Sequence, residues 1–204
     1  AYHNGGSDLS SELYPIMIAF QNKNNLQDIN ATCISDWLWS LPRVGFNVAN
    51  KSHRDMVILL LHRLVMIPKL TPRQVTTSLG GLARMRFKWI QLPESTQNDI
   101  IKALQAVAIQ LNAREICNCL HSLSKLKIPW IGLPPTVRSS LLECFILQSS
   151  AGGLVSQQGS MTIYSLGLMG LKLYDCTPAV QDHIWLVTLA VVEEALVDNR
   201  KNIA

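Results

Sequence analysis

Apolar residues along this chain recur at intervals of three and four, which is the spacing that places side chains on one face of an α-helix. Two stretches show the pattern most clearly, and their apolar positions are Val75, Leu79, Leu82 and Met85 in one and Ile116, Leu120, Leu123 and Leu126 in the other. Each stretch follows a helix start signal of the capping-box type, Thr71-Pro72-Arg73-Gln74 and Asn112-Ala113-Arg114-Glu115. The pattern therefore predicts amphipathic helices that begin near residues 72 and 113.

A second helix is predicted to follow each of these after a short break. Pro129 and the pairs Leu92-Pro93 and Leu133-Pro134 end one helix and begin the next, because proline lacks the amide hydrogen that a helix interior needs. The apolar stripes of the second helices are Ile100, Ile101, Leu104, Val107, Ala108 and Leu111; Val137, Leu141, Leu142 and Phe145; and Val180, Ile184, Val187, Val191 and Ala195. Such stripes are buried only if neighbouring hairpins stack against them.

The chain also resembles itself at a fixed interval. The blocks Leu38–Phe46, Leu79–Trp89 and Leu120–Trp130 follow one another at 41 residues, and a degenerate fourth block, Leu166–Tyr174, follows at 46. A period of this length is typical of stacked supersecondary units, so we predict an all-α fold of about nine helices. The chain is interpreted as a single α-solenoid over 1–204, with units near 30–70, 71–111, 112–156 and 157–200 and a partial unit at 7–25.

The segment 149–160 interrupts the pattern. It is rich in Gly, Ser and Gln and stands where the interval between blocks lengthens. We expect it to be a loop inserted between the third and fourth hairpins, and to break the regular stack.

Composition and charge narrow the functional classes. The 204 residues are 48% apolar and 16% charged, which is enough apolar character for a core and too much for a disordered chain. Eighteen basic residues against 14 acidic ones give a net charge of +4, which is compatible with a nucleic-acid partner and too small to establish one. No apolar run is long enough to cross a bilayer, so no membrane partner is expected.

Catalytic and metal chemistry find little support in the sequence. It holds no nucleophile elbow, phosphate loop, zinc-protease motif or dinucleotide fingerprint, so we expect neither an enzyme nor a cofactor. Cys117, Cys119 and His121 invite a zinc interpretation, but residues two apart on a helix face different ways and no second Cys/His cluster completes four ligands. The five cysteines are therefore predicted to be reduced, mostly buried residues, and no metal site is expected.

What does repeat is positive charge. Counted from the first Leu of each block, a cation stands five residues later at Arg43, Arg84 and Lys125 and seven later at Arg86 and Lys127, with Lys88 and Lys172 nearby. Stacking would bring these residues side by side at the ends of the first helices. One cation per unit is explained by the negative end of a helix dipole, whereas two per turn in consecutive units favour an RNA phosphate backbone.

Other repeated positions allow two interpretations. The residues two before the first Leu, which are Asp36, Thr77, Asn118 and Tyr164, differ between units; they suit either a reader of one base per repeat, with Thr77 and Asn118 as contacts, or simple solvent exposure. Trp89 and Trp130 are interpreted as wedges between hairpins, with base stacking as the alternative. Gly80 and Gly81 are expected to let two helices approach closely.

These blocks carry a family resemblance. The pattern Leu-x-x-Leu-x-Arg/Lys-hydrophobic-x-Phe/Ile-x-Trp followed by Leu-Pro, over roughly 30–197 and most strongly at 71–148, resembles the octotricopeptide and heptatricopeptide repeat proteins. These are related to the repeats preceding RAP domains and to FAST-kinase-like proteins. The resemblance implies an α-solenoid of the mitochondrion, or alternatively the plastid, that binds organellar RNA. It also implies ribonucleoprotein partners, since some members are subunits of mitochondrial ribosomes that hold ribosomal RNA.

A protein–protein scaffold similar to armadillo or HEAT arrays, within a large assembly, is the alternative. A continuous basic strip along Arg43, Arg84 and Lys125 would favour RNA, whereas scattered charges beside an exposed apolar surface would favour a protein partner.

Overall fold

The computed structural model describes residues 29–154 and 156–201, so the predicted partial unit at 7–25 lies outside the described residues. Within these ranges the chain forms eight α-helices and no strand, and the prediction of an all-α fold is confirmed. The helices are α2 (Ala31–Ser40), α3 (Lys51–Val65), α4 (Pro72–Arg84), α5 (Glu94–Val107), α6 (Ala113–Lys125), α7 (Pro135–Ser150), α8 (Ser156–Leu168) and α9 (Pro178–Lys201). Short 3-10 segments join them at Leu41–Val44, Trp89–Gln91, Ala108–Gln110, Trp130–Gly132 and Leu173–Asp175.

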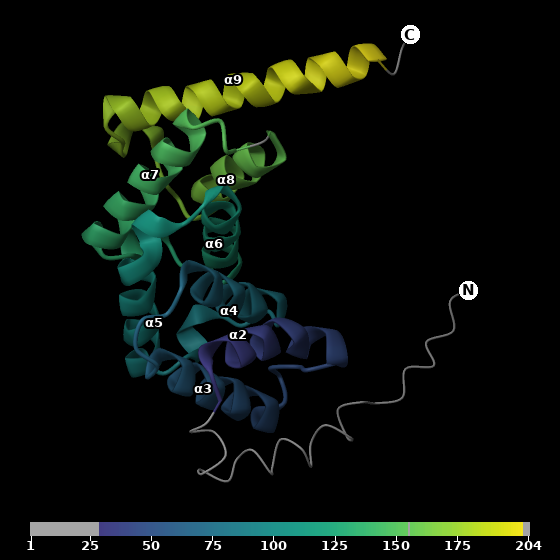
Figure 1. Cartoon of the computed structure of the whole chain (residues 1–204), viewed down its shortest axis with the longest axis vertical. Helices are drawn as coiled ribbons and strands as arrows, with labels where there is room; N and C mark the ends of the chain where they lie inside the picture. The colour runs from purple at the N-terminus through teal and green to yellow at the C-terminus, as the bar shows by residue number, and fades with distance from the viewer. Residues whose placement is uncertain (1–28, 155, 202–204) are drawn as a thin grey trace.

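The helices form two columns (Figure 1). Helices α2, α4, α6 and α8 pack on one another in sequence, and α3, α5, α7 and α9 pack in a second column beside them. The molecule is a crescent whose hollow side is lined by the first column, and the C-terminal half of α9 projects beyond the stack. The arrangement follows from the apolar stripes, because one continuous core of buried residues runs between the columns from Ala31 to Met169.

The start signals read from the sequence are present as capping boxes. The backbone amide of Gln74 donates to Thr71 Oγ1 at 3.3 Å, and Gln74 Oε1 accepts from the Thr71 amide at 2.9 Å. Asn112 and Glu115 make the same pair of hydrogen bonds at 2.9 and 3.0 Å. Each box satisfies two amides at a helix start, and the predictions that helices begin near residues 72 and 113 are confirmed.

The first helices begin at Ala31, Pro72, Ala113 and Ser156, so their intervals are 41, 41 and 43 residues. The expected interval of 46 residues between the third and fourth blocks was wrong by about one helical turn, since the corresponding helices begin 43 residues apart. In the structure Leu166 accepts a hydrogen bond from the amide of Leu171, as Leu123 does from Ile128. Leu166 is therefore the equivalent of Leu123, because a leucine one turn along a helix gives the same sequence pattern.

The expected loop at 149–160 was wrong in extent. Helix α7 continues to Ser150 and α8 begins at Ser156, so the described break is only 151–154. The break is a Schellman turn: Gly152 has φ +67°, and the amides of Gly152 and Gly153 donate to the carbonyls of Ser149 and Gln148. The hydroxyl of Ser149 donates to the Ile146 carbonyl at 2.9 Å, so this serine is satisfied inside the helix.

At the two repeated tryptophans the backbone joins neighbouring units, and burial of the indole rings against the core favours the wedge interpretation over base stacking. The backbone amide of Trp89 donates to the Leu126 carbonyl at 3.2 Å, and that of Trp130 donates to the Met169 carbonyl at 2.7 Å. Trp130 is buried and Trp89 is half-buried against the core. Each tryptophan therefore fixes the start of a second helix to the end of the first helix in the following unit.

Candidate nucleic-acid interface

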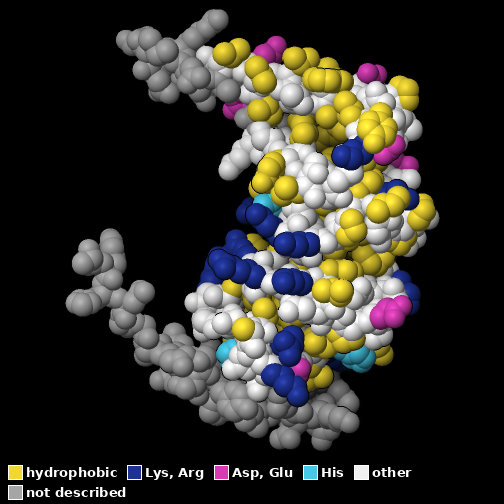
Figure 2. Space-filling model, turned by 180° about the vertical axis from the view of Figure 1, so that it is seen from behind, with side chains coloured by type: hydrophobic (Ala, Val, Ile, Leu, Met, Phe, Trp, Pro, Cys, Tyr) yellow, Lys and Arg dark blue, Asp and Glu magenta, His cyan; other side chains and the backbone are white. Residues whose placement is uncertain are grey.

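A polar groove lies between α4 and α6 on the hollow side of the crescent, and two residues of α2 extend it. Its volume is about 760 Å³. Figure 2 shows Lys and Arg side chains gathered at mid-height along this hollowed edge. The groove is lined by Asp36, Trp39, Arg73, Thr76, Thr77, Gly80, Ala83, Arg84, Arg86, Asn112, Arg114, Glu115, Asn118, His121, Ser122 and Lys125.

The cations of the groove lie at both ends of its helices. Arg73 and Arg114 belong to the first turns of α4 and α6, whereas Arg84 and Lys125 end those helices. Because a helix rises about 1.5 Å per residue, the two ends of the groove lie about 16 Å apart along α4. Between them the floor consists of small or uncharged side chains, among them Thr77 and Asn118. The groove therefore has two cationic ends and a neutral polar floor.

Arg84 is held in place by an aromatic ring. Its guanidinium carbon lies 3.6 Å from the centroid of Trp39, and that of Arg43 lies 5.9 Å from the same centroid. The ring fits because Gly80 faces it: a Cβ at Gly80 would lie 2.7 Å from Trp39 Cζ3. Stacking leaves the donor edge of a guanidinium free for a planar or anionic acceptor. Trp39 therefore connects the cations of the first two units.

The groove carries excess positive charge. Five cations, Arg73, Arg84, Arg86, Arg114 and Lys125, face two acids, Asp36 and Glu115. The carboxylate of Glu115 already accepts from the Asn112 amide. None of the five cations forms an ion pair with any part of the chain that the structure describes. Unpaired charge of one sign in a concave surface attracts ligands of the opposite sign.

His121 lies on the floor beside Lys125. Burial lowers the pKa of its imidazole, and the positive charge of Lys125 lowers it further. The ring is therefore neutral at pH 7, and its Nδ1 is a buried polar atom without a hydrogen-bond partner among the described residues.

The structure brings together five of the eight predicted contacts: Arg84, Arg86, Lys125, Asn118 and Thr77 all line the groove. Arg43 reaches the groove only through its approach to Trp39. Lys88 and Lys127 are exposed but do not line the groove, so their contact with RNA stays a prediction. Lys88 belongs to the turn that leads into the second helix α5, and Lys127 lies in the turn that follows α6.

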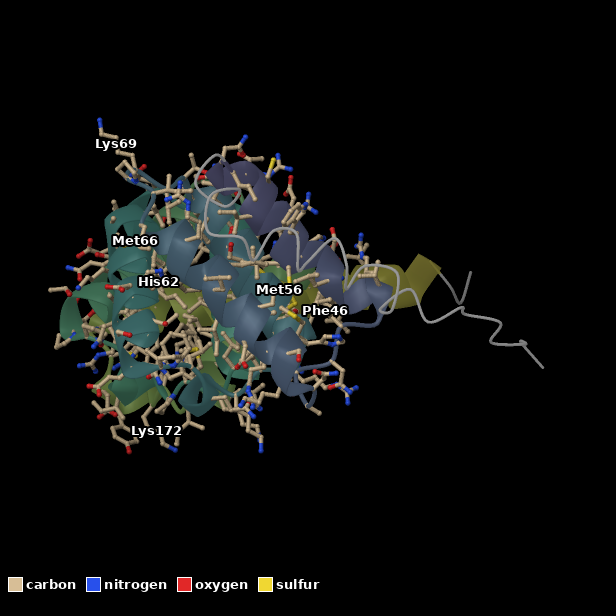
Figure 3. All side chains as sticks on the ribbon, turned by 90° about the horizontal axis from the view of Figure 1, so that it is seen from below. Phe46, Met56, His62, Met66, Lys69 and Lys172 are labelled. Carbon is tan, nitrogen blue, oxygen red and sulfur yellow. The ribbon has the colours of Figure 1, made fainter. Side chains whose placement is uncertain are left out.

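The shorter interval of the fourth unit also reassigns two predicted positions. With an interval of 43 residues between the third and fourth units, the equivalent of Asn118 is Met161 and not Tyr164. Tyr164 instead occupies the position of Trp39, Gly80 and His121 in the first three units. Lys172 becomes the equivalent of Lys88. Lys172 does not line the groove, and Figure 3 shows it at the lower left, away from the free end of α9.

Sequence reasoning missed Arg73, Arg114, Trp39 and His121. The two arginines did carry a signal, because they stand 41 residues apart directly inside helix starts. Trp39 and His121 had no such signal: their column holds Trp, Gly, His and Tyr in the four units, so nothing repeats. Only the packing of α2 on α4 reveals that Trp39 faces Arg84.

The cysteines lie apart from this chemistry. All five are free thiols; Cys117, Cys119 and Cys144 are buried, Cys176 is half-buried and Cys33 is exposed. Burial raises the pKa of Cys119 to about 12 and that of Cys144 to about 11, and the Cys144 thiol donates to the Leu111 carbonyl at 3.1 Å. Such thiols are unreactive packing groups. Across residues 29–154 and 156–201, no three His, Cys, Asp or Glu side chains converge as metal ligands would.

Comparison of the chain with protein-family models, with curated proteins and with solved structures finds no match. Among the described helices, none combines the length and the apolar character that crossing a membrane requires. The function of the groove is therefore inferred from its geometry and charge.

Proposed function

We propose that this chain is an RNA-binding helical-repeat protein that holds single-stranded RNA in the groove between α4 and α6. The observation that carries the proposal is the set of five groove cations without an ion-pair partner among the described residues. Phosphate groups neutralise such cations and release counterions, which is the main source of affinity for nucleic acids.

The groove also suits unpaired bases. The exposed Asn118 and the half-buried Thr77 offer hydrogen-bonding groups on the floor, and the Trp39–Arg84 stack at one end presents a guanidinium fork. Single strands are recognised through such accessible base edges, whereas the base edges of an RNA duplex are buried in its deep groove. A mitochondrial or plastid location, and a place in a ribosome, rest on the family resemblance alone.

A protein–protein scaffold is the second candidate, and one observation favours it. Trp185, Leu189, Val192 and Leu196 recur along α9 at intervals of four, three and four, and each side chain is between 49% and 56% exposed. This spacing is that of a helix seam that pairs with another helix. The two candidates use different surfaces, since the basic groove lies between α4 and α6.

Salt-dependent binding tests the first candidate. We expect a labelled single-stranded RNA to bind more weakly as salt rises, and the triple variant Arg84→Gln, Arg86→Gln, Lys125→Gln to reduce the logarithmic salt slope by about 0.7 per lost contact. The matched control is Lys69→Gln, Lys102→Gln, Lys172→Gln, which removes the same charge at exposed positions outside the groove. Equal effects of the two variants would indicate that only net charge matters, and would contradict a groove site.

A further inference from the structure

The turn that ends each first helix repeats in all four units. Residues at the same position, Gly45, Arg86, Lys127 and Gly170, have φ values of +84°, +59°, +61° and +85°. In the second and third units the flanking amides close a Schellman motif: Phe87 donates to Leu82 and Ile128 donates to Leu123. The backbone therefore requires a left-handed residue at one fixed place in every unit.

Glycine is the residue that this place favours. A Cβ is crowded at positive φ, so glycine is usual at such helix ends and other residues are strained there. The first and fourth units follow the rule with Gly45 and Gly170. The two central units instead hold a long cation, Arg86 or Lys127, in the strained conformation. The fold by itself gives no reason for a cation at this position in place of glycine.

The helix dipole does not explain the exchange either. Arg84 and Lys125 already place a cation in the last turn of α4 and α6, in ordinary helical conformation. Arg86 and Lys127 are both exposed and make no ion pair with described residues. Residues held in strained conformations are concentrated at functional sites, where a ligand contact is gained. Arg86 lines the groove, and Lys127 lies at the equivalent place one unit further along the stack.

We propose that Arg86 and Lys127 bind successive phosphates of one RNA strand that crosses the C-terminal ends of α4 and α6. They occupy these positions although glycine there would make the fold more stable. The proposal rests on the RNA-binding function and adds a path to it: the strand runs across the helices, over the two central units. Where the same turn holds glycine, at Gly45 and Gly170, the phosphate contacts end.

Glycine substitution separates binding from folding. In Arg86→Gly and Lys127→Gly the strain is relieved and the charge is removed, so the midpoint of thermal unfolding should rise while RNA affinity falls. Each substitution should reduce the logarithmic salt slope by about 0.7, the value expected for one phosphate contact to a single strand. Most substitutions at a contact residue lower affinity without raising stability, so this pair of opposite changes is specific to the proposal.

Lys69→Gly is the matched control. Lys69 has φ +59°, like Arg86, does not line the groove, and projects at the upper left of Figure 3, away from the free end of α9. Its glycine variant should raise the unfolding midpoint and leave the affinity for a labelled single-stranded oligouridine unchanged. If the groove variant Arg84→Gln, Lys125→Gln weakens binding but Arg86→Gly and Lys127→Gly do not, the proposed path is wrong and RNA binding stands. If the wild-type protein does not bind the RNA at all, both proposals fail.

Discussion

At the scale of single residues, the groove depends on close side-chain contacts around Trp39 and His121. Trp39 lies against Gly80 and supports Arg84, and His121 keeps an unpaired Nδ1 beside Lys125. The repeated cations Arg84 and Lys125 could be predicted because they recur at a fixed interval in the sequence. The aromatic and imidazole groups between them could not, because their column changes from unit to unit and only packing brings it to the groove.

His121 predicts a pH dependence of stability. Its pKa is lowered in the folded protein, so the unfolded chain binds the proton more tightly. Stability should therefore fall as pH decreases through the window that begins near the ordinary histidine pKa of about 6.5 and ends at the lowered value. Unfolding midpoints at pH 7.5 and 5.5 check this against His121→Gln, which should lose less stability on acidification. An equal loss in both proteins would show that His121 does not contribute.

At the scale of elements, the capping boxes explain why helix starts were predicted well and the fourth unit was not. Thr71 and Asn112 are unambiguous signals with a defined hydrogen-bond partner three residues later. The fourth unit lacks such a box in its sequence, and Leu166 matches the repeat pattern equally well one turn out of register. The loop at 149–160 was overestimated for a related reason, since Gly and Ser indicate a break but not how many residues it takes.

The contact between α2 and α4 predicts a large effect of one methyl group. A Cβ at Gly81 would lie 2.3 Å from the backbone oxygen of Leu38, which cannot move without separating the helices. Gly81→Ala should therefore destabilise the fold by roughly 1–3 kcal/mol.

Gly167 provides the comparison for this variant. It lies in α8, and apart from its chain neighbours and the backbone of its own helix no atom lies within 4 Å of the added methyl group. Gly167→Ala should stabilise by about 0.5–1 kcal/mol, since alanine favours the helix. Denaturant unfolding measures both variants. Similar free energies of unfolding for the two would refute the close approach of α2 and α4.

At the scale of the whole molecule, the crescent has two distinct surfaces: a basic groove on its hollow side and an apolar stripe along α9. The all-α fold followed from the sequence because amphipathic stripes can be buried only by stacking. The exposure of the α9 stripe could not be predicted from the sequence. Trp185 stands as far from the start of α9 as the partly buried Leu142 stands from the start of α7, and the two differ only because α9 is the last helix of the stack.

Helix α7 inside the stack and helix α9 at its end differ in burial, and the effect of this difference on stability can be measured. Leu141 in α7 is 0% exposed, whereas Leu189 in α9 is 56% exposed. Leu141→Ala should destabilise by roughly 2–5 kcal/mol through lost burial and the cavity left behind. Leu189→Ala should change the free energy of unfolding by less than about 1 kcal/mol. A comparable loss at Leu189 would mean that α9 is covered by something outside the described residues.

The location of bound RNA is the most direct test of the central claim. Single-stranded RNA carrying photoreactive uridines would be cross-linked to the protein, and the attached peptides identified by mass spectrometry. The account predicts cross-links within α4 and α6, in the turns that follow these two helices and at Trp39, with few on α9 and none on α3, α5 and α7. Cross-links confined to α9 or to α3, α5 and α7, or an absence of cross-links despite binding, would contradict it.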